Sequence, residues 1–290
     1  MSPYSIVLNS PELLCPIVGI IGLMIGSFLN VVIYRLPIIL QRGWKQECQE
    51  FLELPVEKSA EIFNLALPGS HCPACNAEIT ALQNIPVFSY LFLKGKCAHC
   101  KTSISLRYPF IEALTGLLSV IVAYQLGGQT ETLFALILTW TLIALSGIDF
   151  DHQLLPDNIV LPMLWLGLFL SLFNIFTDPV SSIMGAIAGY LFLWTIYQLF
   201  KLLTGKEGMG YGDFKLLALF GAWLGWQYLP LIILFSSLVG AIIGTSMIIF
   251  VNRDKNIPIP FGPYLAIAGW IALLWGEQLN RLYLTQTGLL

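Results

Sequence analysis

Two aspartates stand at the ends of apolar segments, where a carboxylate is costly to place. Asp149 directly follows the uncharged run 132–148, and Asp213 closes the tetrapeptide Gly210-Tyr211-Gly212-Asp213 that opens another apolar segment. An ionisable residue at membrane depth is a candidate functional residue by default. Because paired carboxylates can act as general acid and general base, these two could together hydrolyse a bond at a membrane surface.

The composition indicates the environment of these aspartates. The chain has 290 residues, of which 57% are hydrophobic and 11% are charged, and its mean hydropathy is +0.78. This composition excludes a water-soluble domain of that length. We therefore expect an all-α polytopic membrane protein, and the two aspartates suggest an aspartic protease embedded in the bilayer.

Apolar segments predict about eight transmembrane helices. A helix that spans a bilayer needs roughly 17 to 25 residues. Six uncharged runs approach or exceed that length: 13–34, 132–148, 159–176, 180–200, 229–251 and 257–275. Two further segments, 108–126 and 214–228, each carry one charge near the start, Glu112 and Lys215. We count both as spans.

The basic residues predict the orientation of these helices, because cytoplasmic loops retain Lys and Arg. Eight crossings with both termini outside place thirteen of the fourteen basic residues in the cytoplasm and leave only Arg281 on the other side. Without the short segment 214–228, Arg253 and Lys255 would be exported. The charge distribution therefore supports eight crossings.

A long insertion between the first and second helices carries a metal-binding pattern. We expect residues 1–35 and 108–290 to form the membrane bundle and residues 36–107 to form a cytoplasmic insertion. The insertion contains Cys72-Pro-Ala-Cys75 and Cys97-Ala-His-Cys100, separated by 21 residues. Four cysteines at this spacing predict one tetrahedral zinc ion. The alternative, a pair of disulfides, needs an oxidising compartment, which a cytoplasmic location denies.

The same pattern predicts what the metal does. Four cysteines complete the zinc shell and leave no open position for water, so the zinc should stabilise a small fold and not hydrolyse a substrate. His71 and His99 could replace a thiolate, but the four cysteines are the favoured ligands. Cys15 and Cys48 stand apart from both pairs and are expected to be inert.

Several acidic residues near these motifs have simpler interpretations. Asp157 precedes an apolar run and is expected to cap the fourth helix, whereas Asp151 and His152 are expected in an exposed loop. Asp213 could also be a helix cap, although the alternating glycines before it permit an unusual backbone and close approach. A row of glutamates in the insertion favours a solvated helix face over a docking strip for a basic substrate: Glu47, Glu50, Glu53, Glu57 and Glu61.

The order and spacing of these motifs resemble those of the bacterial type IV prepilin peptidases. The resemblance covers nearly the whole chain. The matching segments are Gly26-Ser27-Phe28-Leu29-Asn30-Val31-Val32, Tyr34-Arg35-Leu36-Pro37, both cysteine pairs, Arg107-Tyr108-Pro109, residues 148–157, residues 208–215 and Pro260-Phe261-Gly262-Pro263-Tyr264.

The resemblance implies a bifunctional membrane enzyme. Such an enzyme cleaves type IV prepilins and pseudopilins after a glycine at the cytoplasmic face of the bacterial inner membrane. It then methylates the new N-terminal residue with S-adenosylmethionine. Asp149 and Asp213 match the positions of the catalytic pair, and the methyl transfer points to the insertion around Gly95 and Lys96. Prepilins, pseudopilins and membrane lipid are the expected partners, and no nucleic acid is expected.

Helix polarity suggests how the two aspartates divide the work. Asp149 ends a helix, where the negative dipole end disfavours its anion, whereas Asp213 begins one, where the positive end favours it. We therefore expect Asp213 to be the base and Asp149 the acid in the resting enzyme. Two other classes of protein remain open on the residues alone: an ion- or proton-coupled transporter that uses the buried aspartates, and a non-catalytic scaffold of a secretion apparatus.

Overall fold

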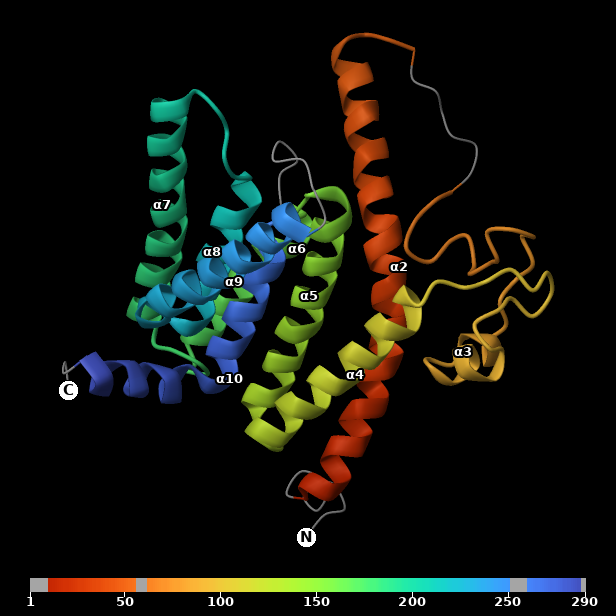
Figure 1. Cartoon of the computed structure of the whole chain (residues 1–290), viewed down its shortest axis with the longest axis horizontal. Helices are drawn as coiled ribbons and strands as arrows, with labels where there is room; N and C mark the ends of the chain where they lie inside the picture. Colours follow the sequence, from red (N-terminus) through yellow and green to blue (C-terminus); the bar gives the residue numbers. More distant parts are fainter. Residues whose placement is uncertain (1–9, 56–61, 251–259, 288–290) are drawn as a thin grey trace. The chain divides into compact units, whose positions relative to one another are not determined.

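The chain folds into helices that form two compact units, residues 1–128 and 129–290. The computed structural model describes residues 10–55, 62–250 and 260–287. Within these ranges the regular elements are α-helices and short 3-10 helices, with no β-strand (Figure 1). The expected all-α class is confirmed.

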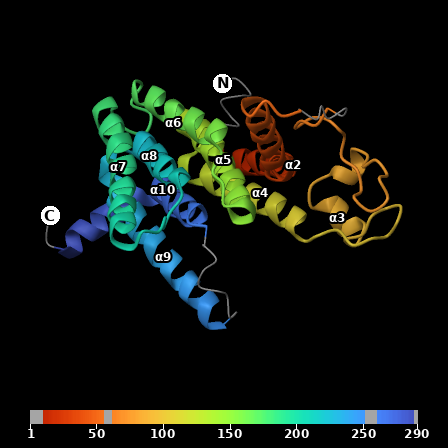
Figure 2. The same ribbon diagram turned by 90° about the horizontal axis from the view of Figure 1, so that it is seen from above.

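The first unit is built on a pair of packed helices, α2 (Pro11–Phe51) and α4 (Arg107–Leu126) (Figures 1 and 2). A Cβ atom on Gly22 would lie 2.5 Å from the Ser119 hydroxyl, and one on Gly26 would lie 2.7 Å from the Cα atom of Glu112. Small residues at this contact therefore let the two helices approach closely, as is common between helices in membranes. The insertion between them also contains η1 (Leu82–Asn84) and α3 (Phe88–Phe92).

Helix α2 is longer than the expected first span. It continues beyond residue 34 through Pro37 and ends at Phe51. Glu47 and Glu50 lie on this helix, whereas Glu53 follows its end with a positive φ of 53°. Glu57 and Glu61 lie outside the described residues. The expectation that the five glutamates share one helix face is therefore wrong at Glu53.

The second unit surrounds one buried helix. In chain order its elements are α5 (Thr130–His152), α6 (Asp157–Ser171), α7 (Pro179–Thr204), α8 (Tyr211–Leu224), η2 (Trp226–Tyr228), α9 (Leu229–Phe250) and α10 (Gly262–Thr287). Helix α8 packs against α6, α7 and α10. From Asp213 to Leu224 every residue of α8 except Lys215 is buried. The helix that carries Asp213 is thus the core of this unit.

Glycine also sets the closest contact of α8. A Cβ atom on Gly185 of α7 would lie 2.3 Å from the carbonyl oxygen of Gly221, and one on Gly189 would lie 2.7 Å from that of Leu217. The two helices therefore touch through their backbones. On another side of α8, the Trp223 indole donates a hydrogen bond to the carbonyl of Met163 at 2.8 Å.

In the part of the chain that the structure describes, five helical segments are long and apolar enough to cross a membrane: Pro11–Phe51, Arg107–Leu126, Thr130–His152, Pro179–Thr204 and Trp226–Ser246. A multi-pass membrane protein is therefore supported. Helix α6 is apolar but shorter. Helix α8 has 14 residues and is about 21 Å long at the rise of an α-helix, less than the ~30 Å hydrocarbon core. The count of eight spans remains a prediction.

Candidate active site and metal centre

Asp149 lies in the last turn of α5, where its side chain is 5% exposed. Its Oδ2 atom accepts a hydrogen bond from the backbone N–H of Gly262, the first residue of α10, at 3.0 Å. A Cβ atom on Gly262 would lie 2.6 Å from that same oxygen. Only glycine therefore lets the backbone approach the carboxylate at this distance.

Asp213 lies in the first turn of α8, and its side chain is 7% exposed. Gly210 occupies the N-cap position, no side chain caps the helix, and the N–H of Asp213 donates to the Gly210 carbonyl at 3.2 Å. Asp213 is thus not the helix cap, which was the simpler interpretation. Leu155 lies against Gly212, the residue before Asp213, and against Gly262, whose N–H binds the Asp149 carboxylate. The fold therefore places the two predicted residues in the same region of the second unit.

Leu155 packs against the residue before Asp213 and against the glycine that binds Asp149. A Cβ atom on Gly212 would lie 2.7 Å from the Leu155 Cβ, and one on Gly262 would lie 3.2 Å from the Leu155 Cδ2. Leu155 is itself buried. It therefore fills the space between the first turns of α8 and α10 with apolar atoms. Sequence reasoning did not single out Leu155 or Gly262, although both lie within segments that carry the family resemblance.

Asp157 makes an ion pair instead of a helix cap. Helix α6 begins at Asp157 with Pro156 as its N-cap, so the predicted capping role is wrong. Both carboxylate oxygens of Asp157 accept from the Lys215 ammonium at 2.7 Å. This pair joins the start of α6 to the first turns of α8. Asp151 and His152 are exposed as expected, but they belong to the last turn of α5 and not to a loop.

The four predicted metal ligands form one cluster. The Sγ atoms of Cys72, Cys75, Cys97 and Cys100 all lie within 4.8 Å of one another, and those of Cys72 and Cys100 are 3.7 Å apart. A tetrahedral zinc with bonds of ~2.3 Å requires sulfur atoms about 3.8 Å apart. The donor set therefore fits a closed zinc site. Among the described residues, neither His71 nor His99 belongs to this cluster.

The two cysteine pairs adopt the same local structure. The N–H of Cys72 donates to the Ala77 carbonyl at 2.9 Å, and the N–H of Cys97 donates to the Thr102 carbonyl at 2.9 Å. In each turn the residue that follows the second cysteine has a left-handed backbone: Asn76 has a φ of 54° and Lys101 a φ of 60°. These turns aim all four thiols at one point.

Gly95 lies two residues before Cys97, the first cysteine of the second pair. Its φ is +67°, and a Cβ atom there would lie 2.7 Å from the Tyr90 hydroxyl oxygen. Both a positive backbone dihedral and a close approach therefore require glycine at this position. The neighbouring Lys96 donates its N–H to the Leu93 carbonyl at 3.1 Å and pairs with Ser103 in an isolated bridge.

A buried carboxylate of α4 reaches the insertion. The Glu112 Oε2 atom accepts a hydrogen bond from the N–H of Val87 at 2.8 Å, and Val87 has a positive φ of 61°. Asn30 of α2 donates to the Tyr108 carbonyl at 3.1 Å. The sequence marks Glu112 only as a charge near the start of an apolar segment. Its partner lies 25 residues away in an irregular stretch, where no periodic pattern identifies it.

Comparison with known proteins places this site in a family. Residues 20–126 match the bacterial peptidase A24 N-terminal domain, and residues 136–245 match the type IV leader peptidase family. The chain belongs to the type IV leader peptidase family. No solved structure matches the chain.

Curated relatives match this chain from end to end. The prepilin leader peptidase/N-methyltransferase of Stutzerimonas stutzeri is 56% identical over 286 residues, which is 98% of each chain. The proteins of that name from Aeromonas salmonicida and Legionella pneumophila are 56% identical over 277 residues and 45% identical over 280 residues. The match to the Aeromonas protein covers 95% of each chain, and the match to the Legionella protein covers 97% of this chain and 98% of the relative.

Proposed function

We propose that this protein is a prepilin leader peptidase and N-methyltransferase. The observation that carries the proteolytic activity is that two buried carboxylates, Asp149 and Asp213, stand at helix ends that share the neighbour Leu155, in a chain of this family. The substrates are prepilins and pseudopilins, cleaved after a leader-terminal glycine. The new N-terminal amine is then methylated.

The two aspartates would divide acid and base catalysis between them. One carboxylate removes a proton from water, the resulting hydroxide attacks the scissile carbonyl, and the other carboxyl group protonates or hydrogen-bonds the carbonyl oxygen. Water adds to the carbon, and the peptide C–N bond breaks when the amine leaves with a proton. Helix polarity favours Asp213 as the base. At Asp149 the helix dipole disfavours the anion, whereas the hydrogen bond from the Gly262 N–H favours the ionised carboxylate. We therefore treat the pair as one unit that holds a single proton.

The membrane arrangement is part of the same proposal. Eight crossings place the aspartates and the zinc insertion on the cytoplasmic side of the bacterial inner membrane, in contact with lipid. The bundle comprises residues 1–35 and 108–290, and the insertion comprises residues 36–107. The positions of Lys and Arg support this orientation. Arg253 and Lys255, which bear on the count of crossings, lie outside the described residues.

Methyl transfer is assigned to the insertion. S-adenosylmethionine supplies the methyl group, and the residues proposed to contact the donor are Gly95 and Lys96. The positive φ of Gly95 supports this role, because it gives the backbone before the second cysteine pair a conformation that most other residues rarely adopt. Zinc bound to Cys72, Cys75, Cys97 and Cys100 would hold this part of the chain in shape.

One assay separates this function from the other classes of protein. Detergent-solubilised protein is incubated with a prepilin peptide and labelled S-adenosylmethionine, and the products are weighed by mass spectrometry. The proposed enzyme releases a leader-sized fragment and adds label to the remainder. A transporter or a scaffold would leave the peptide intact, and a transporter would instead move ions across reconstituted vesicles.

A further inference from the structure

The loop that leads to Asp213 is rich in glycine. Residues 205–210 connect α7 to α8 and include Gly205, Gly208 and Gly210. Glycine has the largest backbone freedom of any residue, so such a loop loses much conformational entropy when it adopts one structure. A fixed position for the first turn of α8 therefore needs contacts that hold the loop in place.

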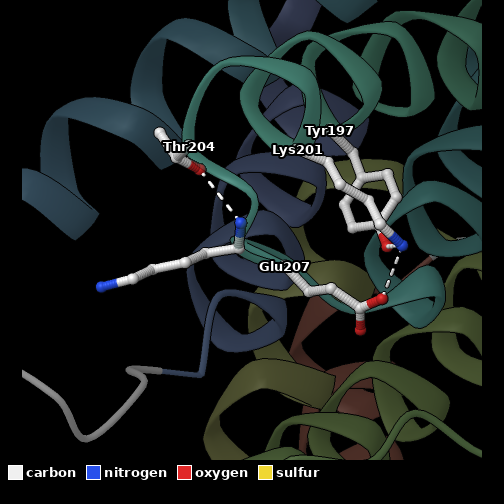
Figure 3. A network of polar contacts seen from close by, with 5 residues as sticks. Tyr197, Lys201, Thr204 and Glu207 are labelled. Atoms are coloured by element: carbon white, nitrogen blue, oxygen red, sulfur yellow. Dashed lines mark hydrogen bonds and ion pairs between the residues drawn. The ribbon is translucent and has the colours of Figure 1, made fainter.

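Two side chains at the end of α7 and in this loop supply such a contact (Figure 3). The Lys201 ammonium donates to the Glu207 carboxylate at 2.8 Å and lies 3.4 Å from the Tyr197 hydroxyl. The hydrogen bond from Lys201 lowers the pKa of Glu207. The start of the loop is also held, because the N–H of Lys206 donates to the Thr204 hydroxyl at 3.2 Å.

Tyr197 connects this polar contact to the residues around Asp213. Its side chain is 2% exposed, and its ring centroid lies 5.4 Å from that of Tyr211 and 5.6 Å from that of Phe214. Tyr211 and Phe214 are themselves 5.4 Å apart. These two aromatic residues stand on either side of Asp213 in the sequence. A continuous set of contacts therefore runs from Lys201 and Glu207 to the turn that carries Asp213.

We propose that Lys201 and Glu207 are positioning residues for peptide cleavage: their ion pair fixes the 205–210 loop and, through Tyr197 and Tyr211, the orientation of the Asp213 carboxylate. This role rests on the proposed proteolytic function. Both members of the pair are substantially exposed, so the pair contributes little to stability. Loss of the pair should loosen only the loop, so its effect should appear in the rate of cleavage and not in the thermal unfolding midpoint.

The variants for the test remove or reverse the two charges. Glu207→Gln and Lys201→Met each remove one charge, and the double variant Lys201→Glu/Glu207→Lys restores the attraction with the charges exchanged. The control is Glu277→Gln, which breaks the exposed ion pair between Glu277 and Arg281 within α10. For each protein, kcat and KM are measured on a prepilin peptide, and the thermal unfolding midpoint is measured on the same preparation.

The expected result is a fall in kcat of about twofold to fivefold for both single variants, with KM and the unfolding midpoint unchanged, and no effect in the control. The exchanged pair should recover most of the lost kcat. Recovery is incomplete because Glu at position 201 lies at the C-terminal end of α7, where a negative charge is unfavourable. Raising KCl from about 20 mM to about 500 mM should lower kcat of the wild-type enzyme toward that of Glu207→Gln and leave the variant unchanged.

Failure of this role and failure of the proposed function give different results. If the wild-type enzyme cleaves the peptide and both single variants match its kcat, the positioning role is wrong and the protease remains. A kcat loss that the exchanged pair does not reverse would also overturn the positioning role. If the wild-type enzyme does not cleave any prepilin peptide, the proposed function fails, and the positioning role fails with it.

Discussion

The Asp149 carboxylate is held by the backbone N–H of Gly262, 113 residues further along the chain. The contact joins the last turn of α5 to the first turn of α10. A main-chain donor at a helix N-terminus is a favourable partner for an anion. The site therefore draws its residues from three helices, because Asp213 comes from α8.

The first prediction concerns Gly262. A methyl group there would lie 2.6 Å from the Asp149 carboxylate and must displace it. We expect Gly262→Ala to lower kcat/KM for prepilin cleavage about 10- to 100-fold, the equivalent of losing a hydrogen bond to a charged group. The matched control is Gly43→Ala in α2, where a Cβ atom meets nothing within 4 Å. Equal activity of both variants would show that the Gly262 contact does not matter for catalysis.

The second prediction concerns the metal. Purified protein should contain about one zinc per chain, bound by the four clustered cysteines. Cys72→Ser combined with Cys97→Ser should lose the metal, whereas Cys48→Ser, which changes an exposed cysteine of α2, should keep it. Elemental analysis decides the outcome. Zinc that persists after one cysteine is removed from each pair would identify other ligands.

The third prediction separates the two activities. Gly95→Leu combines a strained positive φ with a clash against Tyr90, so it should abolish methyl transfer while leader release continues. Asp213→Asn should do the reverse and still methylate a pre-cleaved pilin peptide with an N-terminal phenylalanine. The control is Gly127→Ala, which has a φ of +65° and no Cβ contact. Methyl incorporation is measured beside leader release, and parallel loss of both in every variant would argue for one shared site.

Much of this structure can be predicted from the sequence, because membrane helices and metal-binding cysteines obey strong local rules. The run 108–126 anticipates α4 (Arg107–Leu126) within one residue at its start. The spacing of the cysteine pairs likewise anticipates the cluster. These signals depend on residue type and separation, which are visible in one sequence.

The remaining contacts depend on residues that are distant in the chain. Asp157 has the local signature of a helix cap, yet its carboxylate pairs with Lys215, 58 residues away. Glu112 accepts from the N–H of Val87, and Asp149 accepts from the N–H of Gly262, and a backbone N–H carries no sequence signature. The packing of α7 on α8 does have a sequence signature, the spacing of Gly185 and Gly189, but that spacing is informative only once the partner helix is known.

The most direct test of the catalytic pair is cleavage of a prepilin peptide by four single variants that insert normally into the membrane. Asp149→Asn and Asp213→Asn keep the shape of each side chain but remove its ability to exchange a proton, so each should abolish leader release. Asp151→Asn and Asp157→Asn change exposed residues and should retain most of the activity. Near-normal cleavage by either Asp149→Asn or Asp213→Asn would contradict the assignment of these two residues as the catalytic pair.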